Sequence, residues 1–116
     1  MDAGRAWRGG DAGRSTVIPY LRAYGGEVAW MIISHPHADH VGGAASVLRT
    51  LHPPALLDAA FAGSSEPYRE TLAEAERQGT HWHRAHPGER VMVDGVELLT
   101  LAPDSAWTAS LHDPNL

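Results

Sequence analysis

The sequence predicts a small α/β domain in which short strands alternate with helices. Residues 28–33 form a continuous apolar run, Val-Ala-Trp-Met-Ile-Ile, which is the pattern of a strand buried on both faces. Segments with helical periodicity lie on both sides of this run. The expected order is a loop, a helix, a strand, a helix, a strand, a helix and two paired strands.

Composition sets the limits of this domain. A chain of 116 residues can bury one small core and no second one. Hydrophobic residues make up 43% and charged residues 20% of the chain, and both values are ordinary for a globular domain. Because the chain has no cysteine, a disulfide framework and a thiolate zinc site are both excluded.

Charge and hydropathy bear on partners and localisation. The net charge of −5 gives no footprint for nucleic acid, because the nine Lys and Arg residues are spread along the sequence. A bound metal ion would still attract a phosphodiester. No apolar run approaches the length of a membrane span, and the N-terminus has no hydrophobic signal-peptide core. The chain as given is expected to be soluble, and the sequence leaves its localisation open.

The first helix is expected after an irregular N-terminus. Residues 1–14 contain four glycines and show no periodicity, which is typical of a loop. Ser15 is the expected N-cap of the helix, and Pro19 lies in its first turn. Gly25 and the glycine after it are expected to end the helix.

The middle of the chain predicts a helix, a strand and another helix. The second helix is expected to begin after Gly43 and to end before Pro53, and a short strand follows at residues 55–59. The third helix is expected over residues 66–78, with Ser65 as a cap and Gly79 as its stop. Its charged residues are expected to form a solvated face: Glu70, Glu74, Glu76 and Arg77.

A β-hairpin is expected near the end of the chain. Residues 91–93 and 96–101 are apolar runs joined by Asp94-Gly95, and Asp-Gly is typical of a type I′ turn. The tail from Ala102 onwards shows no periodicity and no cap, so no complete element is expected there.

A histidine cluster follows directly after the first apolar run, with the sequence His-Pro-His-Ala-Asp-His at residues 35–40. Alternate side chains of an extended segment point the same way, so His35 and His37 can present two imidazoles to one ion. Asp39 and His40 follow as the chain turns into a helix, and a carboxylate beside an imidazole suits a second divalent ion. Two ions about 3.5–4 Å apart can activate a water and stabilise a leaving oxygen without any nucleophilic side chain.

The two glycines after this motif have two interpretations. Gly42 and Gly43 can let the backbone approach the ions, while the next helix N-terminus offers N–H groups to a phosphate or carboxylate. They can equally be ordinary loop glycines, and the sequence leaves both interpretations open.

The remaining histidines are expected to be surface residues rather than ligands. His81 and His83 alternate on a strand beside Trp82, with His86 after them and no carboxylate between them. A ligand triplet is the less favoured alternative for these three. Two more are assigned to the surface: His52 and His112.

These features resemble the metallo-β-lactamase superfamily and, more narrowly, the hydrolase domain of the ComEC competence proteins. The resemblance covers most of the chain, and the histidine motif followed by Val-Gly-Gly is its highly specific part. The stretches that carry it are Asp2-Ala-Gly, residues 17–22, residues 33–43, residues 88–91 and residues 96–99.

The resemblance implies part of an αββα sandwich, roughly its N-terminal half, with metal ions at one sheet edge. It implies four metal ligands: His35, His37, Asp39 and His40. Asp39 would also be catalytic, because it would bind the second ion and help to orient the attacking water. Asp2 would support the site from behind its ligands. Two zinc ions are the cofactor expected for the complete domain, with manganese as the alternative.

The chain also departs from the family pattern. The later ligands, from a Gly-Asp and a His-His-Gly-Ser-like segment, are absent, and so are the strands expected before Asp2. We therefore interpret residues 1–116 as a single, truncated domain, with residues 113–116 as the approach to a further strand. ComEC proteins are membrane-embedded DNA-uptake channels, so the resemblance implies DNA, or another phosphodiester, as substrate and a membrane-associated parent protein.

Three functional hypotheses follow. The first is a metal-dependent hydrolase, in particular a phosphodiesterase or nuclease of DNA uptake, with esters, thioesters and lactams left open as substrates. The second is a non-catalytic remnant that binds metal weakly without turnover, because the later ligands are absent. The third is a structural metal clip, in which the histidines hold the fold together. The oligomeric state is not predicted.

Overall fold

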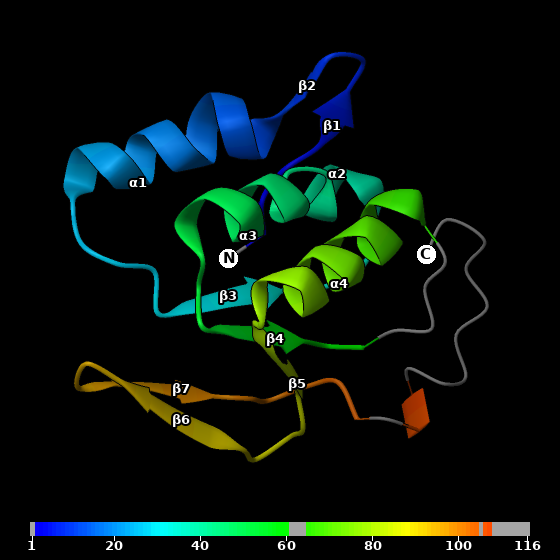
Figure 1. The fold of residues 1–116 in the computed structure, drawn as a ribbon. Helices are drawn as coiled ribbons and strands as arrows, with labels where there is room; N and C mark the ends of the chain where they lie inside the picture. Colours follow the sequence, from blue (N-terminus) through cyan, green and yellow to red (C-terminus); the bar gives the residue numbers. More distant parts are fainter. Residues whose placement is uncertain (1, 61–64, 105, 108–116) are drawn as a thin grey trace.

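A three-stranded parallel sheet forms the centre of the molecule. The computed structural model describes residues 2–60, 65–104 and 106–107. The strand order is β3-β4-β5, with β3 at Trp30–Ile33, β4 at Ala55–Asp58 and β5 at His81–Arg84. Helices cover one face, and a β6–β7 hairpin lies on the other side of the sheet (Figure 1). The predicted α/β class is confirmed.

Helical crossovers connect the parallel strands, as this topology requires. α3 (Ala44–Leu51) lies between β3 and β4, and α4 (Glu66–Gln78) lies between β4 and β5. The buried core lies between these helices and the sheet, and includes Met31, Ile33, Leu48, Leu56, Tyr68 and Ala75. Because all three strands are parallel, their carboxyl ends meet at one edge of the sheet.

β3 is shorter and less buried than predicted. Within this strand Met31 and Ile33 are buried, whereas Trp30 and Ile32 are only half-buried. All four residues of β4 are buried, because β4 is the central strand. The second face of β3 is incompletely covered, since a cavity of about 540 Å³ separates Ile32 from the hairpin strand β7.

The N-terminal segment is more ordered than the predicted loop. β1 (Ala6–Trp7) and β2 (Gly10–Asp11) pair as a short antiparallel hairpin. Two-residue strands carry no detectable period, so the sequence offered no signal for them.

The first helix begins earlier than predicted. It starts as a π-helical turn, η1 (Gly13–Val17), and continues as α1 (Ile18–Tyr24). Ser15 lies inside the helical segment and is not its cap. Instead, the Oδ1 atom of Asp11 accepts a hydrogen bond of 2.9 Å from the backbone N–H of Arg14. Gly25 ends α1 with a φ of 75°, as predicted.

The two glycines of the histidine motif make room for the N-terminal segment. A short helix, α2 (Ala38–Val41), begins inside the motif, so the helical backbone starts before the glycines. A Cβ atom at Gly42 would collide with the backbone of Arg5 and Ala6. One at Gly43 would collide with the backbone of Gly13 and of Ala3. The close approach is therefore between two backbone segments, which neither sequence interpretation anticipated.

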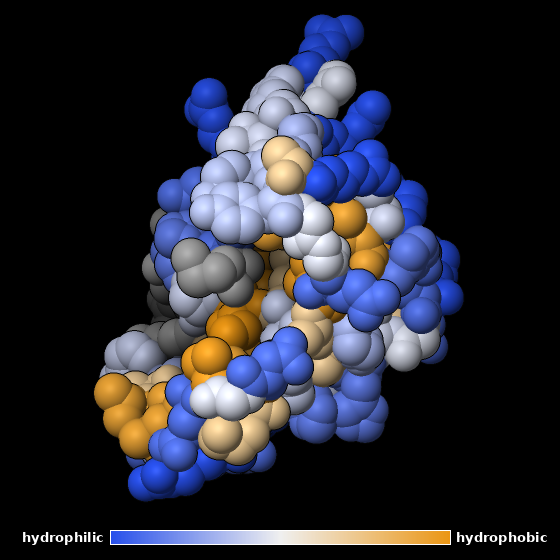
Figure 2. Space-filling model, turned by 90° about the vertical axis from the view of Figure 1, so that its left-hand side faces the viewer, coloured by the Kyte–Doolittle hydropathy of each residue, from blue (hydrophilic) through white to orange (hydrophobic). Residues whose placement is uncertain are grey.

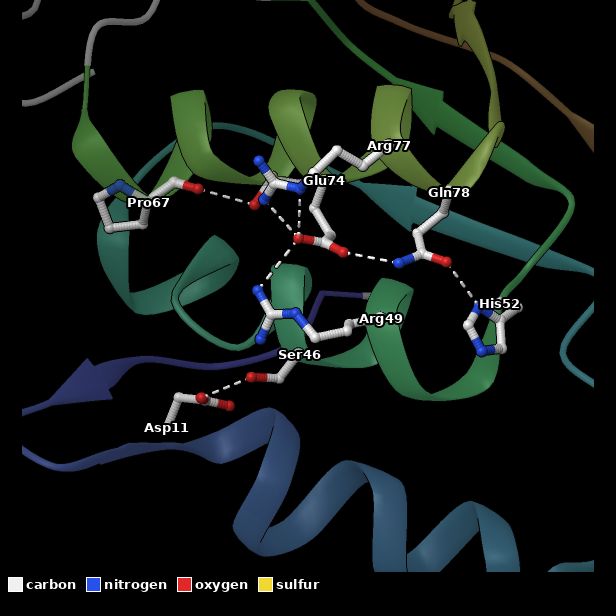
Figure 3. A network of polar contacts seen from close by, with 9 residues as sticks. Asp11, Ser46, Arg49, His52, Pro67, Glu74, Arg77 and Gln78 are labelled. Carbon is white, nitrogen blue, oxygen red and sulfur yellow. Dashed lines mark hydrogen bonds and ion pairs between the residues drawn. The ribbon is translucent and has the colours of Figure 1, made fainter.

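α4 has the predicted bounds but not the predicted solvated face. The Oγ atom of Ser65 accepts a hydrogen bond of 3.4 Å from Tyr68 N–H, and Gly79 ends the helix in the left-handed conformation. Glu74, however, is only 2% exposed. The prediction of a solvated face is wrong for Glu74 because α3 packs against this side of α4 and supplies Arg49 as a partner (Figure 3).

The predicted hairpin is confirmed. β6 (Arg90–Val93) and β7 (Val96–Leu99) are antiparallel, with Val93 paired to Val96. Both turn residues have positive φ, 48° at Asp94 and 80° at Gly95, as a type I′ turn requires.

Apolar side chains are visible in a hollow on one face of the molecule and also at its lower-left edge in Figure 2. Figure 2 shows hydrophobic side chains in the middle of one face, surrounded by hydrophilic ones.

Within the described residues, no helix is both long and apolar enough to cross a membrane. His112 and the tail segment 113–116 lie outside the described residues.

Candidate metal centre

The histidine motif lies at the carboxyl edge of the sheet, where the sequence placed it. β3 ends at Ile33 and α2 begins at Ala38, so the motif spans the turn from strand to helix. His37 has an extended backbone, with φ −63° and ψ 142°, and is the last residue before α2. The turn brings His40 back beside His35.

Three imidazole rings converge at this turn. The ring centroids of His35 and His40 are 3.9 Å apart, and those of His35 and His37 are 4.7 Å apart. The Oδ2 atom of Asp39 lies 3.6 Å from Nε2 of His40, and its side chain is 70% exposed. The structure therefore brings together all four residues that the sequence proposes as ligands.

Asp2 supports this cluster from behind. Its carboxylate accepts hydrogen bonds from the N–H of Ser34 at 2.8 Å and from the Ser34 hydroxyl at 2.6 Å. Its Oδ2 atom also lies 2.8 Å from Nδ1 of His40. An ionised carboxylate can only accept, so Nδ1 of His40 carries a proton, and in the neutral form of the ring Nε2 carries the lone pair. With three hydrogen bonds already made, Asp2 is better suited to orienting His40 than to binding an ion itself.

Ser34 fixes a second imidazole in the same way. Its single hydroxyl proton is donated to Asp2, so Ser34 Oγ accepts from Nδ1 of His35, 2.9 Å away. In the neutral form of the His35 ring, the lone pair is therefore on Nε2 as well. One candidate ligand atom from each of Asp2, His35 and His40 lies within 4.8 Å of the others. Sequence reasoning missed Ser34, although its position between a strand end and the first histidine was a usable signal.

The pKa values of the site favour metal binding. Burial lowers the pKa of His35, and the charges of His40 and His37 lower it further, against a smaller opposing effect of Asp2 and Asp39. Burial alone would raise the pKa of Asp2, but the hydrogen bonds from Ser34 and His40 together hold it below its ordinary value. At neutral pH the site therefore combines a neutral His35 with an ionised Asp2, and a metal needs its ligands deprotonated.

The donor set fits a divalent cation. Imidazole nitrogen and carboxylate oxygen are ordinary zinc ligands, and carboxylate oxygen also suits manganese. Nε2 of His35 and Nε2 of His40 are the best-defined ligand atoms, because hydrogen bonds fix both tautomers.

Two further polar side chains join the elements around the motif. Ser65, the cap of α4, donates its hydroxyl to the carbonyl oxygen of Pro36 at 2.8 Å. Asp58, fully buried at the end of β4, accepts from Tyr68 Oη at 2.6 Å and from Trp82 Nε1 at 3.0 Å. Sequence reasoning missed both contacts, because each joins elements far apart in the chain.

The other histidines lie elsewhere in the fold. His81 and His83 are on β5 with their ring centroids 4.3 Å apart, and His83 lies 5.1 Å from the ring of Trp30. His81 pairs with Ala55 at the start of β4, at the end of the sheet away from the motif. His52 is 2.8 Å from Oε1 of Gln78. Among the described residues, the group with metal-ligand spacing contains none of these histidines.

Comparison with known proteins gives a family and two relatives. Residues 2–109 match the Metallo-beta-lactamase superfamily. Recombination protein 2 of Haemophilus influenzae is 34% identical over 85 residues, which cover 73% of this chain and 10% of that protein. Uncharacterized protein YcaI of Escherichia coli is 45% identical over 47 residues, which cover 40% of this chain and 6% of that protein.

These relatives are far longer than the chain, which spans a tenth or less of each. No solved structure matches. The family match nevertheless extends over nearly the whole chain and includes Asp2 and the complete histidine motif. The resemblance drawn from the sequence is thus confirmed, and so is the partial metallo-β-lactamase character of the fold. The chain belongs to the metallo-β-lactamase superfamily.

Proposed function

We propose that this chain binds a divalent metal ion and contributes to the hydrolysis of a phosphodiester. The proposed ligands are His35, His37, Asp39 and His40. The observation that carries the proposal is the hydrogen-bonded unit of Asp2 and Ser34, because it holds the Nδ1 proton of two neighbouring imidazoles, so that Nε2 of each neutral ring can bind a metal ion. Membership of the superfamily supports hydrolysis as the reaction class.

The residues of the chain have distinct roles in this proposal. When bound, one or two divalent ions would polarise a phosphoryl oxygen and lower the pKa of a water. His35 and His40 are held in fixed tautomers, so their ligand atoms need little reorganisation. The exposed carboxylate of Asp39, 3.6 Å from His40 Nε2, is suited to orient the attacking water and to accept its proton.

DNA is the phosphodiester that we propose. The resemblance of the motif to ComEC proteins supports it, as does similarity to a relative named Recombination protein 2. The proposal includes a membrane-associated parent protein that takes up DNA, and a complete domain with two zinc ions or, alternatively, manganese. A general superfamily hydrolase of esters, thioesters or lactams would use the same site residues.

A second candidate function is metal binding without turnover. The observation that favours it is the absence of the later family ligands from the 116 residues. A structural metal clip is a third candidate. The clip predicts loss of helical circular dichroism on chelation, whereas a hydrolase site on a preformed core predicts that the signal survives.

The test is turnover of bis(p-nitrophenyl) phosphate by the full chain with added zinc or manganese. We expect metal-dependent turnover that Asp39→Asn abolishes while the three histidines still hold one ion, and that His37→Ala abolishes together with metal binding. His52→Ala is the matched control and should leave both unchanged. Zinc binding with no turnover in either metal would reject the hydrolase in favour of the second candidate.

A further inference from the structure

The N-terminal segment has the opposite charge to the rest of the chain. Four of the nine arginines precede Gly25, at positions 5, 8, 14 and 22, together with only two of the fourteen acidic residues. This segment is therefore net positive, although the whole chain has a formal charge of −5. The sequence count hides the asymmetry, because the arginines are separated along the chain.

Both acidic residues of the segment are already engaged. Asp11 accepts from Arg14 N–H at 2.9 Å and from the Ser46 hydroxyl at 2.7 Å, and Figure 3 shows the second of these bonds. Asp2 accepts from His40 in the histidine centre, which is the group formed by Asp2, Ser34 and the motif at residues 35–40. Within the described residues, the exposed guanidinium groups of Arg5, Arg8 and Arg14 consequently make no ion pair.

Three arginines later in the chain are ion-paired. Arg49 and Arg77 pair with Glu74, and Arg90 pairs with Glu97 at 2.7 Å. A guanidinium group whose N–H donors do not pair with an acidic side chain of the protein is suited to bidentate recognition of phosphate. The positive segment is thus open to an anionic partner.

An exposed aromatic side chain lies between two of these arginines in the sequence and shares a cavity with a third. The indole of Trp7 is 47% exposed and lies against the backbone of Gly10, where an added Cβ would be 3.0 Å from Nε1. A cavity of about 340 Å³ is lined by Trp7, Asp11, Arg14 and Ser15 together with the hairpin glycines. A supported indole beside a guanidinium group is the arrangement on which an unpaired base stacks.

The hairpin is attached directly to the histidine centre. Ala3 N–H donates to the carbonyl oxygen of His40 at 2.8 Å, and Gly43 N–H donates to that of Gly4 at 3.3 Å. Gly42 permits backbone contact with Arg5, as described above. In Figure 1 the hairpin stands beyond α2, on the side of the molecule away from β6 and β7. A chain of phosphates lying on the hairpin would therefore continue towards the motif.

We propose that Arg5, Trp7, Arg8 and Arg14 form a basic patch that holds a single-stranded polynucleotide beside the metal centre. One base stacks on Trp7, and the arginines contact the phosphates. A duplex is disfavoured because its base faces are already stacked and cannot reach the indole. The inference rests on the proposed phosphodiester chemistry, since it names the substrate class and the surface that holds it.

The test is fluorescence anisotropy of a labelled twelve-nucleotide oligothymidylate with the full chain, in chelator and at varied salt. Three phosphates contacted by arginine predict a slope of about −2 for log binding constant against log salt. Arg8→Gln should weaken binding and reduce the steepness of this slope by about 0.7. Trp7→Ala should weaken binding by about tenfold or more.

Controls separate the patch from general attraction to polyanions. Arg69→Gln removes the same charge from an exposed position of α4, which packs on the other side of α3, and should leave binding unchanged. Oligouridylate should bind like oligothymidylate, because neither stacking nor phosphate contact requires one sugar. Inorganic polyphosphate should be insensitive to Trp7→Ala. Equal affinity for duplex and single strand, or unchanged binding in both patch variants, would overturn the proposal.

The experiments distinguish rejection of the basic patch from rejection of the proposed hydrolase function. Patch-dependent binding in chelator, with no hydrolysis in metal, would reject the hydrolase and keep the binding surface. Metal-dependent hydrolysis of bis(p-nitrophenyl) phosphate, with no patch-dependent oligonucleotide binding, would reject the surface alone. Circular dichroism of Trp7→Ala checks that the exposed side chain is not needed for folding.

Discussion

The side chains that contact Glu74, which we call the Glu74 network, and the histidine centre are both clusters of polar groups. Their hydrogen bonds are arranged in opposite ways. Around Glu74 every carboxylate oxygen faces a donor from the chain. Arg49 and Arg77 approach Oε2, and Gln78 donates to Oε1 at 2.8 Å (Figure 3). These donors come from α3 and α4, so the network joins two helices and needs nothing from outside.

The histidine centre uses its own donors differently. Ser34 and His40 direct their hydrogens towards Asp2, and His35 directs its Nδ1 hydrogen towards Ser34. As a result, the imidazoles of His35 and His40 lie side by side with ring centroids 3.9 Å apart, and among the described residues no arginine pairs with the Asp2 carboxylate behind them. A buried acid paired with arginines stabilises the fold, whereas neighbouring neutral imidazoles are complementary to an added cation.

Removing one imidazole should give the largest effect. We expect His35→Ala to lower zinc affinity by more than about a hundredfold, because loss of a ligand exceeds the 10–100-fold loss typical of its supporting partners. Competition with a chromogenic chelator measures this. His52→Ala, in the Glu74 network, is the matched control and should bind zinc like the unmodified chain. Equal losses in both variants would mean that zinc binds histidines generally.

Removing the support behind the imidazoles should give the next effect. Asp2→Asn keeps the shape of the side chain but removes the charge that fixes His40 as the Nδ1 tautomer. We expect zinc affinity to fall by about 10–100-fold. The same chelator competition gives the result, and an unchanged affinity would show that Asp2 does not orient the ligand.

Removing the acid of the other region should change stability instead. Glu74→Gln leaves Arg49 and Arg77 without their carboxylate, and both arginines are about half exposed, at 51% and 59%. We expect a loss of about 1–3 kcal/mol in the free energy of unfolding. Urea denaturation measures it. Zinc affinity should not change, and a parallel loss of affinity would contradict the independence of the two regions.

Acidic pH should weaken the Glu74 network, whereas changes of pH near neutrality should leave it unaffected. Hydrogen bonds from Gln78 and Arg77 lower the pKa of Glu74 to about 2 from an ordinary 4.5. A depressed pKa stabilises the fold above the unfolded value, so this contribution is complete above pH 4.5 and is lost towards pH 2. Urea midpoints between pH 3 and 7 should fall less steeply in Glu74→Gln than in the unmodified chain. Identical pH profiles would contradict the assignment.

Local signals predicted much of the fold correctly. Ser65 and Gly79 bound α4, and Asp94-Gly95 forms the turn of the β6–β7 hairpin, because caps and type I′ turns depend on a few adjacent residues. The position of the histidine motif after a buried strand was also predictable, since a short apolar run has few alternatives. These features need no knowledge of tertiary contacts.

Contacts between residues far apart in the sequence could not be predicted from the sequence alone. Burial of Glu74 depends on Arg49, which is 25 residues away, and a charged residue on an amphipathic helix ordinarily faces solvent. The link from Ser34 to Asp2 spans 32 residues. The sequence thus indicated the four proposed ligands but not the hydrogen bonds that place the Nδ1 protons of His35 and His40.

X-ray absorption at the zinc edge tests the central claim most directly, because it reports the atoms around the bound ion. The full chain loaded with one equivalent of zinc should show nitrogen and oxygen neighbours at about 2.0–2.1 Å, with the outer-shell scattering of at least two imidazoles. His35→Ala should lose part of that imidazole signal. Failure to retain zinc, or a spectrum without imidazole, would contradict the account.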